Sequence, residues 1–307
     1  MPSSPQPPPA VEDLARQRQQ AREARDYPLA DLLRGQIVAA GWDVVDTAGG
    51  YTLAPRQAPV ETFPSYAAVP TRYPEADACT HSLCLAFHGW PEDVERLLAS
   101  VMASAGGRVG EIEVVIAVVA GEPGAALSGF SHPALSRPPV LVRVGDNLGH
   151  GEALAIAGRR ARGRLLHFVE PSLEFGWQVL DAAGAVLGDA SVGATGPFGL
   201  TTADWREFHP APAGDVLALE YLLSIRRADV PRIGEMDPAY RFYRNLDLDY
   251  SRQVAAAGLT IRSFDAEVTR HAHRLWEATA AADRDRLSRR NFNRLLDRWV
   301  RPGAPSS

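Results

Sequence analysis

The chain has 307 residues, of which 46% are hydrophobic and 22% charged, a composition typical of a globular protein. This length accommodates one large domain and a small appendage. The formal charge of -5 at pH 7 argues against a protein that binds nucleic acid over its whole surface. No apolar run approaches the roughly 20 residues that a membrane-spanning helix needs, so we expect no transmembrane segment.

The amino terminus and the cysteines bear on the cellular compartment. Residues 1–10 are rich in Pro and Ser, which predicts disorder, and they lack the charged and apolar regions of a secretory signal. The only cysteines, Cys79 and Cys84, are too few for a disulfide framework and make a poor zinc site. We therefore expect free thiols and a cytoplasmic protein.

A helical hairpin with a small β tail is predicted for residues 11–55. A polar first helix is interrupted at Tyr27-Pro28, because the residue before a proline is pushed out of helical geometry. Apolar residues at helical spacing predict a second helix over Leu29–Ala40. The segments Trp42–Val45 and Tyr51–Leu53 then predict a short β-hairpin.

This hairpin resembles the carboxyl-terminal tail module of cysteinyl-tRNA synthetases. The shared features include an Arg-Asp pair before the second helix, the sequence Ala-Asp-Leu-Leu-Arg within it, and Asp-Thr shortly before Gly-Gly. The resemblance covers none of the catalytic synthetase motifs, so it does not imply aminoacylation. Two interpretations stay open, a packing or dimerising hairpin and a retained tRNA-binding element; we favour the first.

The large domain is expected over residues 79–302. Before it, residues 56–78 contain several prolines and little periodicity, which predicts a linker. After it, residues 303–307 are expected to be disordered. Within it, predicted strands alternate with predicted helices, which requires crossover connections and indicates an α/β fold with a doubly wound, mostly parallel sheet. The strands are expected at 82–87, 111–120, 140–144 and 165–169, and the helices at 91–104 and 151–161.

Ligands of such sheets bind beyond the carboxyl ends of the strands, where two loops stand out. The loop Gly145–Glu152, GDNLGHGE, opens a helix, whose free N–H groups would suit a diphosphate. Packing alone also explains glycines there. The fourth strand ends in Glu170 and Glu174, whose oxygens would suit Mg²⁺ or Mn²⁺. The alternative for both glutamates is a solvated loop.

Over residues 81–275 the order of motifs resembles the family-2-like glycosyltransferases of the GT-A fold. Matching features are the first strand with its Pro-containing loop and helix, AFHGWPEDVERLLASV, and the Asn-x-Gly loop at Asn147-Leu148-Gly149. An acidic motif ends the fourth strand, and an acidic turn precedes a helix with aspartates. A bacterial subgroup is closer still, on the segments Ser172–Glu174, Tyr243–Asp247, His271–Arg274 and Arg286–Phe292.

The departures from the family concern the catalytic base. The family places Glu-Asp where this chain has Arg244-Asn245, and an amide cannot accept a proton. Asp247 matches the second acidic position and is the preferred base; Asp249 is an alternative without family support. Asp237 matches the acidic turn, as a catalytic or a structural residue. Arg244 would stabilise diphosphate charge.

The resemblance also implies a metal and nucleotide site. The metal ligands would be Glu170, Glu174 and His271, whose partner two residues on, His273, would face the same side of a strand. The nucleotide sugar would be bordered by the first three loops, with the residues His88, Glu122, Asn147, Gly149, His150 and Glu152.

The last helical stretch, residues 283–300, is amphipathic and rich in arginine. We favour packing against the domain with a solvated charged face. A second interpretation places its basic face on an anionic lipid surface, as a peripheral membrane contact.

The resemblance implies a cytoplasmic glycosyltransferase of the hexosyltransferase type. It would transfer a sugar from a nucleoside-diphosphate donor to an unknown acceptor hydroxyl, by a single displacement with inversion and with a divalent cation, Mg²⁺ or Mn²⁺. Two departures keep an alternative open, a catalytically weak binding or scaffold protein of the same fold. One is the pair Arg244-Asn245; the other is the acidic motif, which has glutamates four residues apart where the family has aspartates two apart.

Overall fold

The computed structural model describes residues 7–301 except 48, 56–59, 109, 123–126, 128–129, 131, 133–134 and 136–137. The disorder expected for residues 303–307 lies outside these, as does most of that expected for 1–10. The first helix already begins at Pro9.

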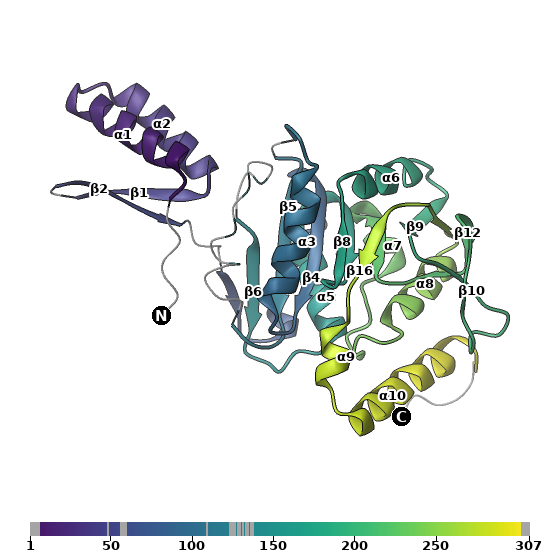
Figure 1. The fold of residues 1–307 in the computed structure, drawn as a ribbon. Helices are drawn as coiled ribbons and strands as arrows, with labels where there is room; N and C mark the ends of the chain where they lie inside the picture. Colours follow the sequence, from purple (N-terminus) through teal and green to yellow (C-terminus); the bar gives the residue numbers. More distant parts are fainter. Residues whose placement is uncertain are drawn as a thin grey trace.

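The amino-terminal segment forms the expected helical hairpin and β tail, with a core of its own. It comprises α1 (Pro9–Glu23), α2 (Tyr27–Ala39), β1 (Trp42–Thr47) and β2 (Gly50–Pro55). Its two helices and hairpin stand at one end of the molecule, beside the large sheet (Figure 1). The expected break between the helices is present, since α1 ends at Glu23, but α2 begins at Tyr27 and not at Leu29, because a proline is tolerated in the first turn of a helix.

Nine strands form one mixed sheet in the described part of the chain. Its order is β12-β15-β9-β14-β7-β4-β5-β6-β3. The strands β7, β4, β5, β6 and β3 run parallel, and β14 is antiparallel to both β7 and β9. The expected mostly parallel, doubly wound sheet is confirmed. The strands are β3 (Val60–Phe63), β4 (Cys79–Phe87), β5 (Ile112–Val118), β6 (Val140–Val144), β7 (Gly163–Val169), β9 (Val192–Gly196), β12 (Gly214–Val216), β14 (Leu222–Arg226) and β15 (Thr260–Ser263).

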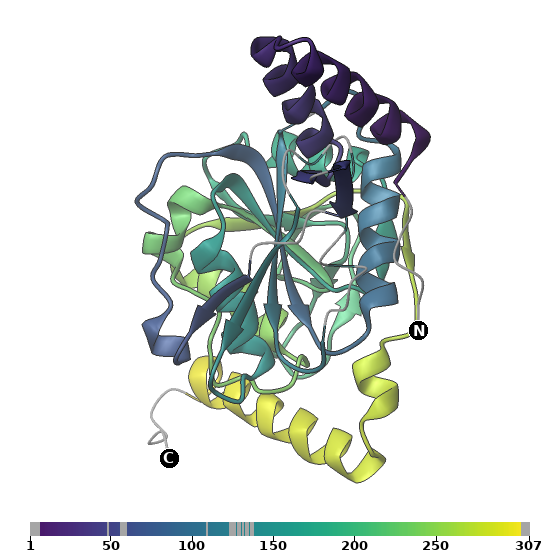
Figure 2. The same cartoon turned by 90° about the vertical axis from the view of Figure 1, so that its left-hand side faces the viewer.

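Helices cover both faces of this sheet and make two hydrophobic cores. One face packs against α5 (His150–Arg160), α7 (Val230–Ile233) and α8 (Leu246–Ala256). The other packs against α3 (Pro91–Ala103) and α6 (Gln178–Val186). The remaining elements are η1 (Tyr66–Ala68), β8 (Leu173–Phe175), β10 (Gly199–Thr201), β11 (His209–Pro210), β13 (Ala218–Leu219), η2 (Arg227–Asp229), β16 (Val268–Arg270), α9 (Arg274–Ala278) and α10 (Ala281–Trp299). Figure 2 shows α9 and α10 running along one border of the domain.

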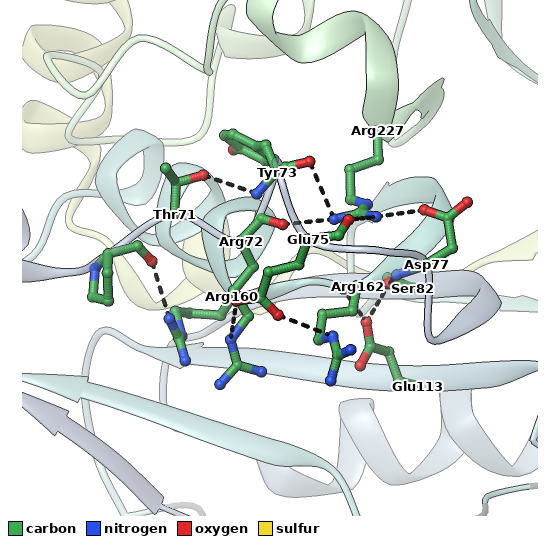
Figure 3. A network of polar contacts seen from close by, with 12 residues as sticks. Thr71, Arg72, Tyr73, Glu75, Asp77, Ser82, Glu113, Arg160, Arg162 and Arg227 are labelled. Atoms are coloured by element: carbon green, nitrogen blue, oxygen red, sulfur yellow. Dashed lines mark hydrogen bonds and ion pairs between the residues drawn. The ribbon is translucent and has the colours of Figure 1, made fainter.

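The segment expected to be a linker belongs to the domain from Val60 onward. The strand β3 pairs in parallel with β6 and is the edge strand of the sheet. Behind it, the buried guanidinium of Arg227 donates to the carbonyl oxygens of Arg72 at 2.6 Å and Glu75 at 2.7 Å and pairs with Asp77 (Figure 3). Arginines of the domain thus satisfy backbone carbonyls that regular structure leaves unpaired, which no local sequence pattern reveals.

A variant of Arg227 tests this anchor. Arg227→Met removes a buried cation and leaves the carbonyl oxygens of Arg72 and Glu75 without this donor, so we expect a loss of about 3 kcal/mol in the free energy of unfolding. The measurement is urea unfolding followed by circular dichroism. Arg164→Met, at an exposed arginine of β7, is the control and should change stability little. Equal stabilities for the two variants would contradict the anchor.

Candidate functional site

A cavity of about 660 Å³ opens beyond the carboxyl end of β7. Parallel α/β sheets bind their ligands at this edge, and the volume suits a small-molecule site. Its walls come from the ends of β7 and β13, the turn before α8, the β10–β11 connection and α10. It therefore joins elements that are far apart in the sequence.

Asp247 is the carboxylate that the cavity perturbs most clearly. Asn245 adopts a left-handed conformation, with φ 67°, and is the amino-terminal cap of α8, which places Asp247 in the first helical turn. The side chain of Asp247 accepts hydrogen bonds from the backbone N–H of Tyr221 at 3.3 Å and of Leu248 at 3.0 Å. Burial, and then the carboxylate of Glu220, raise the pKa of Asp247 to about 7.

Glu220 is a second carboxylate in the same cavity, and the sequence analysis did not identify it. It directly follows β13, and burial raises its pKa, an effect that the charges of Arg270 and Arg244 oppose. Its signal in the sequence is an acidic residue inside an apolar run, LALEYLL. Two carboxylates of raised pKa therefore lie in one cavity, an arrangement found often at catalytic sites.

Each glutamate of the acidic motif has a histidine partner. His273 Nε2 lies 3.2 Å from Glu170 Oε2, and His271 Nε2 lies 2.9 Å from Glu174 Oε2. The antiparallel pairing of β8 with β16 brings these segments together. Both histidines follow β16 and so do not share one face of a strand as expected, because the chain turns into α9 after Arg270.

The arrangement of these pairs limits what they offer a cation. The Nδ1 atom of His273 accepts from the backbone N–H of Trp276 at 3.4 Å, which leaves the ring proton on Nε2, facing Glu170. The contact does not have the geometry of a hydrogen bond, and Nε2 has no hydrogen-bond partner among the described residues. Within the part of the chain that the structure describes, no three His, Cys, Asp or Glu side chains converge as a metal cluster.

The amino terminus of α5 is occupied by the protein itself, which corrects the expected diphosphate site there. The backbone N–H of Gly151 donates to Tyr240 O at 2.8 Å, and that of His150 donates to Arg241 O at 3.3 Å. The N–H of Gly149 donates to the side chain of Glu152 at 2.6 Å. These amides are not presented to an anion.

The glycines of this loop follow from packing. A Cβ on Gly151 would collide with the backbone oxygen of Asp237, and one on Gly149 would lie 2.9 Å from the Cα of Arg241. Arg241 also donates to Asn147 O at 2.6 Å. The segment before α8 is therefore docked on the start of α5, which agrees with the packing interpretation of the loop.

The other expected nucleotide-binding residues do not share one site, and only His150 among them lines the large cavity. His88 Nε2 lies 2.9 Å from His150 Nδ1, the two rings are stacked, and burial lowers the pKa of both, that of His88 to about 4. His88 and Glu170 line a small pocket beside the large cavity. Glu122 is exposed, pairs with Arg143 at 2.5 Å, and lines neither space.

Asp237 and Asp249 hold α10 and do not line the cavity. Asp237 pairs with Arg294 at 2.6 Å, and Asp249 pairs with Arg298 at 2.6 Å. Arg244, in contrast, lines the cavity and stacks over Trp276, 5.4 Å from the ring centroid. Asp237 thus takes the structural role that the sequence left open, and Arg244 keeps the position expected of a charged ligand contact.

The apolar side of α10 packs against the domain. Leu295 and Leu296 are buried, and Phe292 packs with Leu200 and Leu248. This side is not exposed to a lipid surface. Among the described residues, no helix has both the length and the hydropathy to cross a membrane.

The raised pKa of Asp247 predicts a pH-dependent stability. A folded-state pKa near 7, against 3.8 for a free side chain, favours the folded state at low pH, and this contribution is lost as the pH rises from about 4 to 7. The Asp247→Asn variant should not show this loss. The free energy of unfolding of the unmodified protein should therefore fall by on the order of 3 kcal/mol more than that of the variant across this pH range. Urea unfolding of both proteins at pH 4 to 8 measures it. Parallel pH profiles would show an unshifted carboxyl.

Comparison with known proteins identifies the fold. No protein-family model matches the chain. Over 48 residues the chain is 46% identical to the cysteine–tRNA ligase of Opitutus terrae. This matched segment is 16% of this chain and only 10% of the ligase. The crystal structure of GalNAc-T7 with UDP, GalNAc and Mn²⁺ superposes with a TM-score of 0.52 at 15% identity, over 63% of this chain and 43% of that one. The S. aureus TarS 1-349 complex with UDP gives 0.48 at 14% identity, over 72% and 73%. At such identity the likeness shows the fold alone, and this protein has the fold of the GT-A glycosyltransferases.

Proposed function

We propose that the protein is a glycosyltransferase that moves a sugar from a nucleoside-diphosphate donor to an acceptor hydroxyl. The observation that carries this proposal is Asp247, a half-buried carboxyl with a pKa of about 7 in a large cavity at the ligand-binding edge of a GT-A sheet. A general base works best when its pKa lies near the working pH. Asp247 meets this requirement where Asn245 cannot.

The transfer is a single displacement with inversion. The acceptor oxygen attacks the anomeric carbon while the bond from that carbon to the diphosphate oxygen breaks, and the hydroxyl proton passes to Asp247. The two backbone N–H groups that donate to Asp247 hold its carboxylate in place, and burial together with the charge of Glu220 keeps the pKa of Asp247 high. The protein's part is to position the hydroxyl and to receive its proton.

Arg244 would offset charge on the leaving diphosphate, and Glu170 would help to hold a divalent cation there. Glu170 lines the cavity, and its carboxylate is the type of ligand that Mg²⁺ and Mn²⁺ prefer. Since no cluster of three His, Cys, Asp or Glu side chains forms among the described residues, most of the coordination would come from donor oxygens and water. The cation would neutralise the departing charge. The Mn²⁺ in the GalNAc-T7 structure supports a cation in this fold.

A second candidate is a protein that binds nucleotide sugars without turning them over. The occupied amides of α5 favour it, because they remove one source of stabilisation for a leaving diphosphate. Tight donor binding without product, together with unchanged cellular activity of Asp247→Asn, would decide for this candidate.

Activity as a function of pH tests the transferase. We expect hydrolysis or transfer from one of a panel of UDP-, GDP- and dTDP-sugars with Mn²⁺, at a rate that rises with a midpoint near pH 7 as Asp247 loses its proton. Asp247→Asn should lower the rate at least about 100-fold and leave donor affinity unchanged. Asp265→Asn, at an exposed aspartate, is the matched control. No turnover and no thermal shift with any donor would contradict the proposal.

We propose a packing role for the amino-terminal module, without tRNA binding. Its helices carry acidic as well as basic side chains, and the buried Arg18 is already paired with Asp46 at 2.7 Å. A truncated chain beginning at Val60 should keep donor binding, because the module has its own core. Calorimetry with the donor and filter binding with total tRNA compare the two proteins. Binding of tRNA to the full chain that the truncation abolishes would overturn this view.

A further inference from the structure

The part of the large cavity that lies toward the carboxyl terminus has its own chemical character. It is lined by the β10–β11 connection and by α10, with the residues Leu200, Arg206, Phe208, Pro210, Ser288, Arg289 and Phe292. This part combines apolar surface with two guanidinium groups. The carboxylates Glu170, Glu220 and Asp247 line other walls of the same cavity.

Arg206 and Arg289 differ from other arginines of this region. Within α10, Arg294 and Arg298 are paired with Asp237 and Asp249 at 2.6 Å each. Arg206 and Arg289 are exposed to the cavity and make no ion pair with any residue that the structure describes. The aspartate nearest in sequence to Arg206, Asp204, accepts from the backbone N–H groups that follow it, at 2.8 and 3.2 Å.

A cavity with two unpaired guanidinium groups is suited to an anion. Guanidinium groups bind phosphate and carboxylate oxygens through charge-assisted hydrogen bonds. These two come from elements of the second half of the chain. Both line the same cavity as Asp247, the proposed base for the acceptor hydroxyl. An anion held by Arg206 and Arg289 would therefore be part of the acceptor.

We propose that the acceptor is a phosphate-bearing sugar or polyol, with its phosphate bound between Arg206 and Arg289 and its reacting hydroxyl directed to Asp247. This inference rests on the proposed transferase function. Phe208 and Phe292 line the same cavity and would supply an apolar surface for the carbon face of a sugar ring. The phosphate is unchanged in the reaction; the acceptor oxygen forms the new bond to the anomeric carbon, and its proton passes to Asp247.

Binding of matched probes to the full chain tests the proposal. Calorimetry compares glucose 6-phosphate with glucose and glycerol 3-phosphate with glycerol. Each phosphate should bind at least about tenfold more tightly than its neutral partner, because a hydrogen bond to a charged group contributes on that order. Arg206→Gln and Arg289→Gln should each remove about tenfold of this preference. Arg290→Gln is the control, since this exposed arginine lies on the same helix but not on the cavity.

Donor hydrolysis separates this inference from the function on which it rests. The double variant Arg206→Gln/Arg289→Gln should keep donor affinity and hydrolysis and lose the phosphate preference. Equal loss of donor affinity would assign these arginines to the donor and overturn the inference. So would equal affinities for phosphate and neutral probes, or an effect of Arg290→Gln as large as that of Arg289→Gln. If the protein binds phosphate through these arginines but binds no nucleotide sugar, the anion site would be confirmed and the transferase function would be refuted.

Discussion

The attachment of α10 to the turn before α8 determines the geometry of the candidate site. The amide of Asn291, 2% exposed, donates to the carbonyl oxygens of Phe242 at 2.7 Å and Arg244 at 2.8 Å. Asp237, which precedes this turn in the chain, and Asp249, which follows it, also form ion pairs with α10. This turn leads into the left-handed Asn245 and so places Asp247 at the cavity. A helix at the carboxyl terminus thus positions a carboxylate about fifty residues earlier in the chain.

Acidic and basic side chains line different walls of the cavity, and we assign them different roles. Carboxylates lie where burial raises their pKa, and the strongest case, Asp247, is matched to proton transfer near neutral pH. Arginines line other walls of the cavity, where anionic parts of substrates would be bound. The start of α5 takes no part in this division, because protein carbonyl groups occupy its first amides. Arg244 and a cation would then meet the charge of the diphosphate instead.

Much of the fold could be predicted from periodicity, and some of it could not. The run of β-branched residues at β5 and the apolar spacing of α3 placed both elements within a few residues. The edge strand β3 was missed because its short, proline-flanked segment depends on pairing with β6 and on arginines of the domain. Some residues of the candidate site could be predicted from the sequence, and others could not. Asp247 stood out through family resemblance, whereas Glu220 has no motif and lies in the site only because β13 ends there.

The sequence by itself determined the alternation of strands and helices, the separate amino-terminal hairpin and the candidate base, because periodicity, turn residues and motif order are local properties. Tertiary structure decided which of the acidic residues face the cavity. Asp237 and Asp249 resemble Asp247 in the sequence, but both form ion pairs with α10, while Asp247 faces the cavity and pairs with no cation among the described residues. Partners of this kind are set by packing between distant segments, and packing also decides burial and therefore pKa.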